Sequence, residues 1–127
     1  MRIDEKIKEA VIAIRMVGVQ TEGSCEGHRD WGHPYPWISI YAPEQNEPSW
    51  TEANLAERTK VEPLIDEFNS QFSPEYPLIL QNQGVYGAFR IQSFYWKQEV
   101  DPNQLTDYQK IMGAFAQFII RKYSQSS

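Results

Sequence analysis

Helical and extended patterns alternate along this chain in a single order. Residues 4–17 place apolar side chains at spacings of three and four, as an amphipathic helix does, and Gly18 stands where a C-cap glycine would follow. The same period returns at residues 49–72 and 106–123. Short runs of strand composition lie between them, at residues 21–25, 37–41, 78–81 and 88–97. The order helix-strand-strand-helix-strand-strand-helix predicts a two-layer α+β fold, in which three helices cover one face of a mainly antiparallel four-stranded sheet.

Two capping-box patterns predict where the later helices begin. In a capping box, an N-cap hydroxyl and a side chain three residues later satisfy free backbone amides. This spacing occurs in two pairs, Ser49 with Glu52 and Thr106 with Gln109. Pro63 lies inside the second helical pattern and removes an amide donor there. We therefore expect a kink at this proline, or two abutting helices.

Size and composition favour one packed domain. The chain has 127 residues, of which 41% are hydrophobic and 13% aromatic, so a single domain over residues 1–127 can bury a core. We expect residues 124–127 to form a frayed tail. No window has the apolar length of a signal peptide or a membrane helix, and a single cysteine fits a reducing compartment. These features predict a cytoplasmic protein that does not associate with membranes.

The negative charge is concentrated in one part of the chain. Residues 44–75 carry eight acidic and two basic side chains, a local charge of −6 in a chain whose net charge is −5. Such a surface argues against binding to the backbone of nucleic acids, because the phosphates would be repelled. A small basic pocket for an anion is still allowed.

The most reactive side chains lie together in residues 24–37, SCEGHRDWGHPYPW. This segment holds the only cysteine, both histidines and two of the four tryptophans. Cys25, His28 and His33 are candidate zinc ligands, since thiolate and imidazole are groups that zinc prefers. The chain has no second Cys-x-x-Cys or Cys-x-x-His half, so we expect no metal or other cofactor, with zinc as the alternative.

Catalysis is a further interpretation of the same three residues. His28 or His33 could activate Cys25 as a nucleophile for hydrolysis or group transfer, because attack at neutral pH needs a thiolate and a neighbouring base. Closeness in sequence is weak evidence for such a pair, since catalytic cysteines and histidines are usually far apart in the chain. A cysteine at the end of a strand can equally be a small buried apolar residue.

A ligand pocket accounts for more of this segment than either alternative. Flat aromatic faces and donors to phosphate or carboxylate make up the chemistry of nucleotide and sugar sites. Arg90 and Gln92 lie on one face of a strand whose other face is apolar, which makes them candidates for the pocket floor. The predicted ligand-binding residues are His28, Arg29, Trp31, His33, Tyr35, Trp37 and Arg90.

The run VGVQTEGSCEGH, at residues 17–28, resembles small uncharacterised bacterial and phage proteins that carry a Ser-Cys-Glu-Gly-His motif. The resemblance covers residues 3–41 and implies no established activity. More distantly, a helix followed by Thr and Ser-Cys-x-Gly is similar to the tRNA wybutosine-synthesising methyltransferase family, which would imply binding of S-adenosylmethionine and tRNA. Glu26 stands where that family tends to have Ser, His28 stands where its motif ends in Arg, and the acidic charge argues against tRNA.

The sequence therefore predicts a protein that binds a small polar or anionic ligand around residues 24–37. The first alternative is a metal- or thiol-dependent enzyme. The second is an interaction module or homodimer, in which Trp50, Tyr95, Trp96 and the last helix form an interface.

Overall fold

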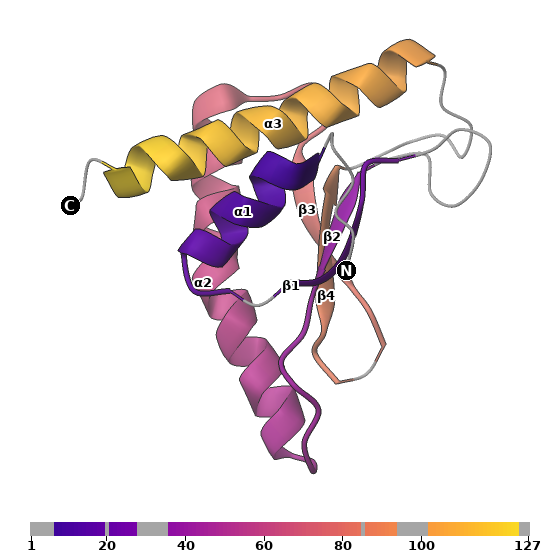
Figure 1. Cartoon of the computed structure of the whole chain (residues 1–127), viewed down its shortest axis with the longest axis vertical. Helices are drawn as coiled ribbons and strands as arrows, with labels where there is room; N and C mark the ends of the chain where they lie inside the picture. The colour runs from indigo at the N-terminus through magenta and orange to yellow at the C-terminus, as the bar shows by residue number, and fades with distance from the viewer. Residues whose placement is uncertain (1–6, 20, 28–35, 85, 94–101, 125–127) are drawn as a thin grey trace.

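The element order agrees with the predicted α+β fold. The computed structural model describes residues 7–19, 21–27, 36–84, 86–93 and 102–124 (Figure 1). The helices are α1 (Lys8–Met16), α2 (Ser49–Phe72) and α3 (Pro102–Ser124). The strands are β1 (Thr21–Cys25), β2 (Trp37–Ile40), β3 (Leu78–Asn82) and β4 (Phe89–Ser93).

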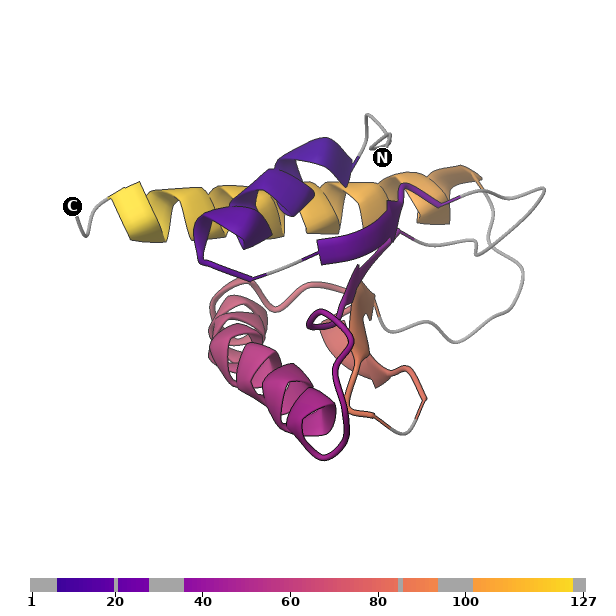
Figure 2. The ribbon, with the colours of Figure 1, turned by 60° about the horizontal axis from the view of Figure 1, so that its bottom comes forward.

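The four strands form one antiparallel sheet in the order β1-β2-β4-β3. Ile38 is paired with Ile91, which is paired with Leu80, so these apolar side chains share one face. The helices cover that face, with α1 alongside α3 and α2 crossing below them (Figures 1 and 2). The core lies between the two layers and is built mainly from Ile14, Ile38, Ile40, Val61, Phe68, Phe89, Ile91, Met112 and Phe115.

The end of α1 confirms the predicted glycine cap. Gly18 has a φ of 80°, which an L-residue rarely adopts. Its amide donates to the carbonyl of Arg15 at 3.0 Å, and the amide of Val19 donates to that of Ile14 at 3.4 Å. This is a Schellman ending, and it turns the chain directly into the sheet.

α2 is one helix from Ser49 to Phe72 with Pro63 inside it, and the expected kink at this proline stays a prediction. Two abutting helices are therefore excluded. The physical reason is position: Pro63 is exposed, whereas Val61, Leu64 and Ile65 beside it are buried in the core. Packing of the buried side holds the helix together, and water can reach the exposed side, where Pro63 lacks an amide donor.

Both predicted capping boxes are wrong. Ser49 is already the first helical residue of α2 and makes no capping contact; the carboxylate of Glu47 instead accepts from the amide of Thr51 at 3.0 Å. Thr106 lies inside α3, where its hydroxyl donates to the carbonyl of Pro102 at 2.9 Å. The helix also includes Ser124, one residue of the predicted tail.

The asparagine Asn54 fixes the lower end of α2 to two loops. Its side chain is fully buried, accepts from the amide of Ala42 at 2.6 Å and donates to the carbonyl of Tyr86 at 2.8 Å. The indole of Trp50 donates to the carbonyl of Ala42 and stacks on Tyr86 with ring centres 5.0 Å apart. Trp50, a predicted interface residue, is thus engaged within the chain.

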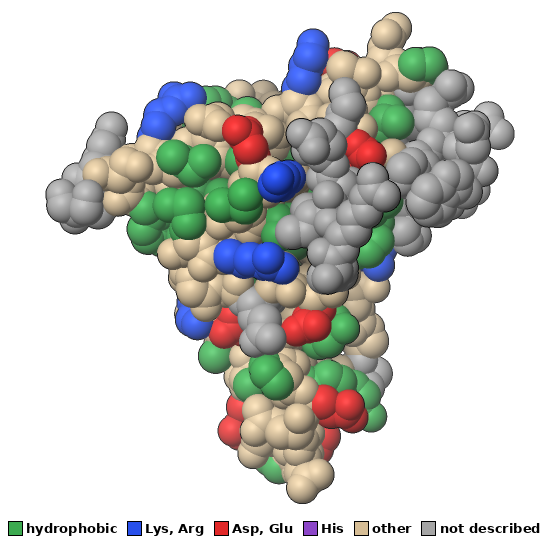
Figure 3. Space-filling model, in the orientation of Figure 1, with side chains coloured by type: hydrophobic (Ala, Val, Ile, Leu, Met, Phe, Trp, Pro, Cys, Tyr) green, Lys and Arg blue, Asp and Glu red, His purple; other side chains and the backbone are tan. Residues whose placement is uncertain are grey.

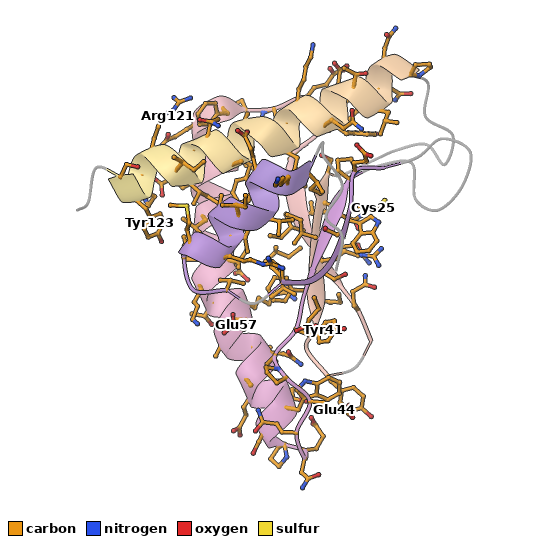
Figure 4. The ribbon with its side chains drawn as sticks, in the orientation of Figure 1. Cys25, Tyr41, Glu44, Glu57, Arg121 and Tyr123 are labelled. Atoms are coloured by element: carbon orange, nitrogen blue, oxygen red, sulfur yellow. The ribbon has the colours of Figure 1, made fainter. Side chains whose placement is uncertain are left out.

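Within the described residues, no helix has both the length and the apolar character to span a bilayer. Acidic side chains gather around the narrow lower end of the molecule, where Glu44 lies (Figures 3 and 4), whereas Glu67 of α2 pairs with Lys122 of α3.

Candidate functional site

The face of the sheet opposite the helices carries the candidate site, and we call it the distal face. Directly opposed residues of antiparallel strands share a face, so the strand register defines its members. One row across the sheet consists of Cys25, Trp37, Gln92 and Ile79. The next row consists of Gly23, Ser39, Arg90 and Gln81.

The register brings Trp37 and Arg90 together. They stand diagonally on the neighbouring strands β2 and β4, and the guanidinium carbon of Arg90 lies 4.4 Å from the centre of the Trp37 ring. This is cation–π distance. Gly23 lies beside the indole on the other neighbouring strand, where a Cβ would be in ordinary van der Waals contact with it at 3.5 Å. Two of the seven predicted ligand-binding residues are thus in contact.

The indole of Trp37 is supported by an aromatic cluster outside the sheet. It packs against Tyr108 of α3, whose ring meets that of Tyr76 edge-on at a centre distance of 4.7 Å. The side-chain amide of Gln104 donates to the hydroxyl of Tyr76 at 3.4 Å. Trp37 therefore contacts α3 through Tyr108 and contacts Arg90 on the neighbouring strand.

Gln92 lies on the distal face with Arg90, as the alternation of the strand predicts. It is only 2% exposed, and its side-chain oxygen Oε1 is buried. Within the described part of the chain this oxygen has no hydrogen-bond partner. The hydroxyl of Ser93 is in the same condition, but it belongs to the opposite, helix-packed face, across from Leu78.

Cys25 closes β1 at the same end of the sheet (Figure 4). Its side chain is 8% exposed, and its sulfur accepts a hydrogen bond from the amide of Gly27 at 3.4 Å. Gly27 has a φ of 92°, which allows the chain to turn back onto the sulfur. This environment is that of a small buried residue at a strand end.

His28, Arg29, Trp31, His33 and Tyr35 lie outside the described residues, so their part in a ligand, metal or catalytic site stays a prediction. The described segments contain no group of three or more His, Cys, Asp or Glu side chains that could hold a metal ion. The zinc and thiol alternatives thus still depend on the two histidines.

One contact at this site has no signal in the sequence. Gln109 of α3 donates from its side-chain amide to the carbonyl of Glu26 at 2.9 Å, and so ties the segment after β1 to the helical layer. The spacing from Thr106 predicts a capping-box role for Gln109 instead. The two partners are 83 residues apart, and no local pattern indicates such a contact.

Two surface hollows are lined by other described residues and not by this pair. One of about 410 Å³ is lined by Arg15, Gly18, Val19 and Thr21. Another of about 350 Å³ lies along α2 beside Arg58 and Pro63. The Trp37–Arg90 pair differs from Arg58 and Phe89 beside the second hollow because its cation lies closer to the ring, at 4.4 Å against 5.7 Å, and because the ring of Phe89 is fully buried.

The comparisons add no family assignment to this geometry. No family model, no characterised protein and no solved structure matches the chain.

Proposed function

We propose that this protein binds a small planar ligand with an anionic group, of the nucleotide kind, at the Trp37–Arg90 pair. The observation that carries the proposal is the position of the Arg90 guanidinium 4.4 Å from the centre of the Trp37 ring. An indole offers a stacking surface to a flat ring on the part that the guanidinium leaves uncovered, and a guanidinium can bind phosphate or carboxylate through two parallel hydrogen bonds.

Pre-organisation favours this use of the pair. A free arginine loses side-chain entropy when it binds a ligand, and less is lost where the guanidinium already rests on an aromatic ring. Trp37 is in turn packed against Tyr108, so the surface that supports Arg90 is itself held in place. A ligand would meet a cation and a ring whose positions are already set.

The charge distribution fits a small anion better than a polyanion. The acidic residues of segment 44–75 would repel a nucleic acid over a wide surface, because repulsion grows with the number of phosphates. A single phosphate or carboxylate needs only local cationic contacts. The proposal assigns the additional contacts to His28, Arg29, Trp31, His33 and Tyr35, as the sequence predicts.

Calorimetric titration with AMP tests the proposal, with adenosine and inorganic phosphate as probes of the ring and the anion alone. We expect AMP to bind more tightly than either fragment, and Arg90→Gln to weaken AMP binding roughly tenfold or more, since it removes a charged hydrogen bond. Equal heats for the wild type and R90Q, or no AMP binding by the wild type, would contradict the proposal.

Arg58 provides the matched control. Its guanidinium carbon lies 5.7 Å from the centre of the Phe89 ring, and its side chain also contacts Glu62 and Asn82. It is thus a second arginine placed over an aromatic ring of β4, outside the proposed site. Arg58→Gln should leave AMP affinity unchanged, and a loss equal to that of R90Q would show that only overall charge matters.

A further inference from the structure

The buried side-chain oxygen of Gln92 is the feature of the distal face that the proposed function leaves unexplained. Gln92 is directly opposite Trp37 across the β2–β4 pair and two positions from Arg90 on the same strand. Its side chain is 2% exposed, and Oε1 has no hydrogen-bond partner among the residues that the structure describes.

A buried amide oxygen without a partner lowers stability, because it has given up its hydrogen bonds to water. A methionine of nearly the same length would fill the position without this cost. An oxygen that costs stability, on the sheet face that carries the Trp37–Arg90 pair, has the character of a recognition group, since buried polar groups give a site its selectivity.

We infer that Gln92 selects among the ligands of the Trp37–Arg90 pair by accepting a hydrogen bond from an amino group on the ligand ring. This inference rests on the proposed function and specifies its ligand class, namely a planar anion that carries an exocyclic amine. Arg90 binds the anionic group, Trp37 stacks on the ring, and the Oε1 atom of Gln92 accepts a hydrogen bond from the amine.

A pair of probes that differ only in the amine tests this directly. AMP carries an amino group on the purine, and purine riboside 5′-monophosphate has a hydrogen in its place. We expect the wild-type protein to bind AMP roughly tenfold or more tightly than the analogue, and Gln92→Met to bind both with the affinity that the wild type has for the analogue.

Thermal unfolding of Gln92→Met without ligand gives a second, independent readout. If Oε1 has no partner within the chain, the midpoint should stay the same or rise. A clear fall would contradict the stability cost assigned to this side chain and would overturn the inference. Ser93→Ala is the matched control, because it removes the buried hydroxyl of the helix-packed face. It should leave the preference for AMP intact.

The outcomes separate this inference from the proposed function. Binding of both nucleotides with equal affinity by the wild type overturns the role of Gln92 alone. Retention of the preference for AMP in Q92M has the same consequence. Failure of the wild type to bind either nucleotide contradicts the proposed function and this inference together.

Discussion

The side chain of Asn69 in α2 holds both backbone polar groups of Leu78, the first residue of β3. Its amide nitrogen donates to the Leu78 carbonyl at 2.8 Å, and its oxygen accepts from the Leu78 amide at 3.0 Å. The helix thereby satisfies backbone groups that an edge strand would otherwise leave free.

Asn69→Ala should therefore destabilise the fold by about 2–3 kcal/mol, because two backbone groups lose their partner at a partly buried position. Urea unfolding monitored by circular dichroism measures the change. Asn82→Ala is the control: it removes one exposed contact, with Arg58 at 2.6 Å, and should cost about 0.5 kcal/mol or less. Equal losses in the two variants would contradict the role of Asn69.

Two glycines of the β3–β4 connection allow the stability cost of a close contact to be measured apart from the cost of backbone strain. Gly84 and Gly87 have nearly equal φ values of 79° and 84°. A Cβ on Gly84 would meet nothing within 4 Å, whereas one on Gly87 would lie 3.3 Å from the Cβ of Asn54. Both alanine variants carry the strain of a left-handed residue, about 1–2 kcal/mol. Only Gly87→Ala should lower the free energy of unfolding by more than that amount, as chemical denaturation measures it. A larger loss for G84A than for G87A would contradict the close contact between Gly87 and Asn54.

Pro63 is a site where stability can be gained. It lies inside α2, where its ring removes a hydrogen bond of the helix. Pro63→Ala should raise the free energy of unfolding by about 1–3 kcal/mol, measured by urea titration. Pro102→Ala is the control, since the first residue of a helix needs no amide donor. A fall in stability for P63A would show that the proline is required where it stands.

The thiol of Cys25 provides a test of the enzyme alternative. Because it is 8% exposed, we expect iodoacetamide to alkylate it roughly tenfold or more slowly in the folded protein than in urea. Mass spectrometry over a time course measures both rates. Alkylation in the folded state near neutral pH that equals or exceeds the rate in urea would favour a reactive thiol.

The sequence predicts the order of elements well because each depends on a local period. The apolar side chains of Ile38, Ile40, Phe89 and Ile91 alternate with polar ones, so the face of each strand follows from the residues alone. Helix ends depend on single contacts instead. The hydroxyls of Ser49 and Thr106 fit a capping pattern, yet the carboxylate of Glu47 makes the capping contact of α2, and α3 begins at Pro102.

The sequence indicates which residue types make up the candidate site, but not which of them are in contact. Trp37 and Arg90 stand in strands separated in sequence by α2 and β3, and their contact follows from the pairing of β2 with β4. Nothing in a single sequence without repeats specifies that pairing. The hydrogen bond from Gln109 to Glu26 is inaccessible to sequence reasoning for the same reason, because tertiary structure alone brings its partners together.

The indole N–H signal of Trp37 in a ¹⁵N–¹H nuclear magnetic resonance spectrum, followed during titration with AMP, tests the central claim most directly. Trp37→Phe and Trp50→Phe identify the two signals, and Trp50 reports on the opposite end of the sheet, beside Tyr86. The account predicts that AMP shifts the Trp37 signal, leaves that of Trp50 in place, and shifts neither in R90Q. A Trp37 signal unmoved at millimolar AMP, or one that moves equally in R90Q, would contradict it.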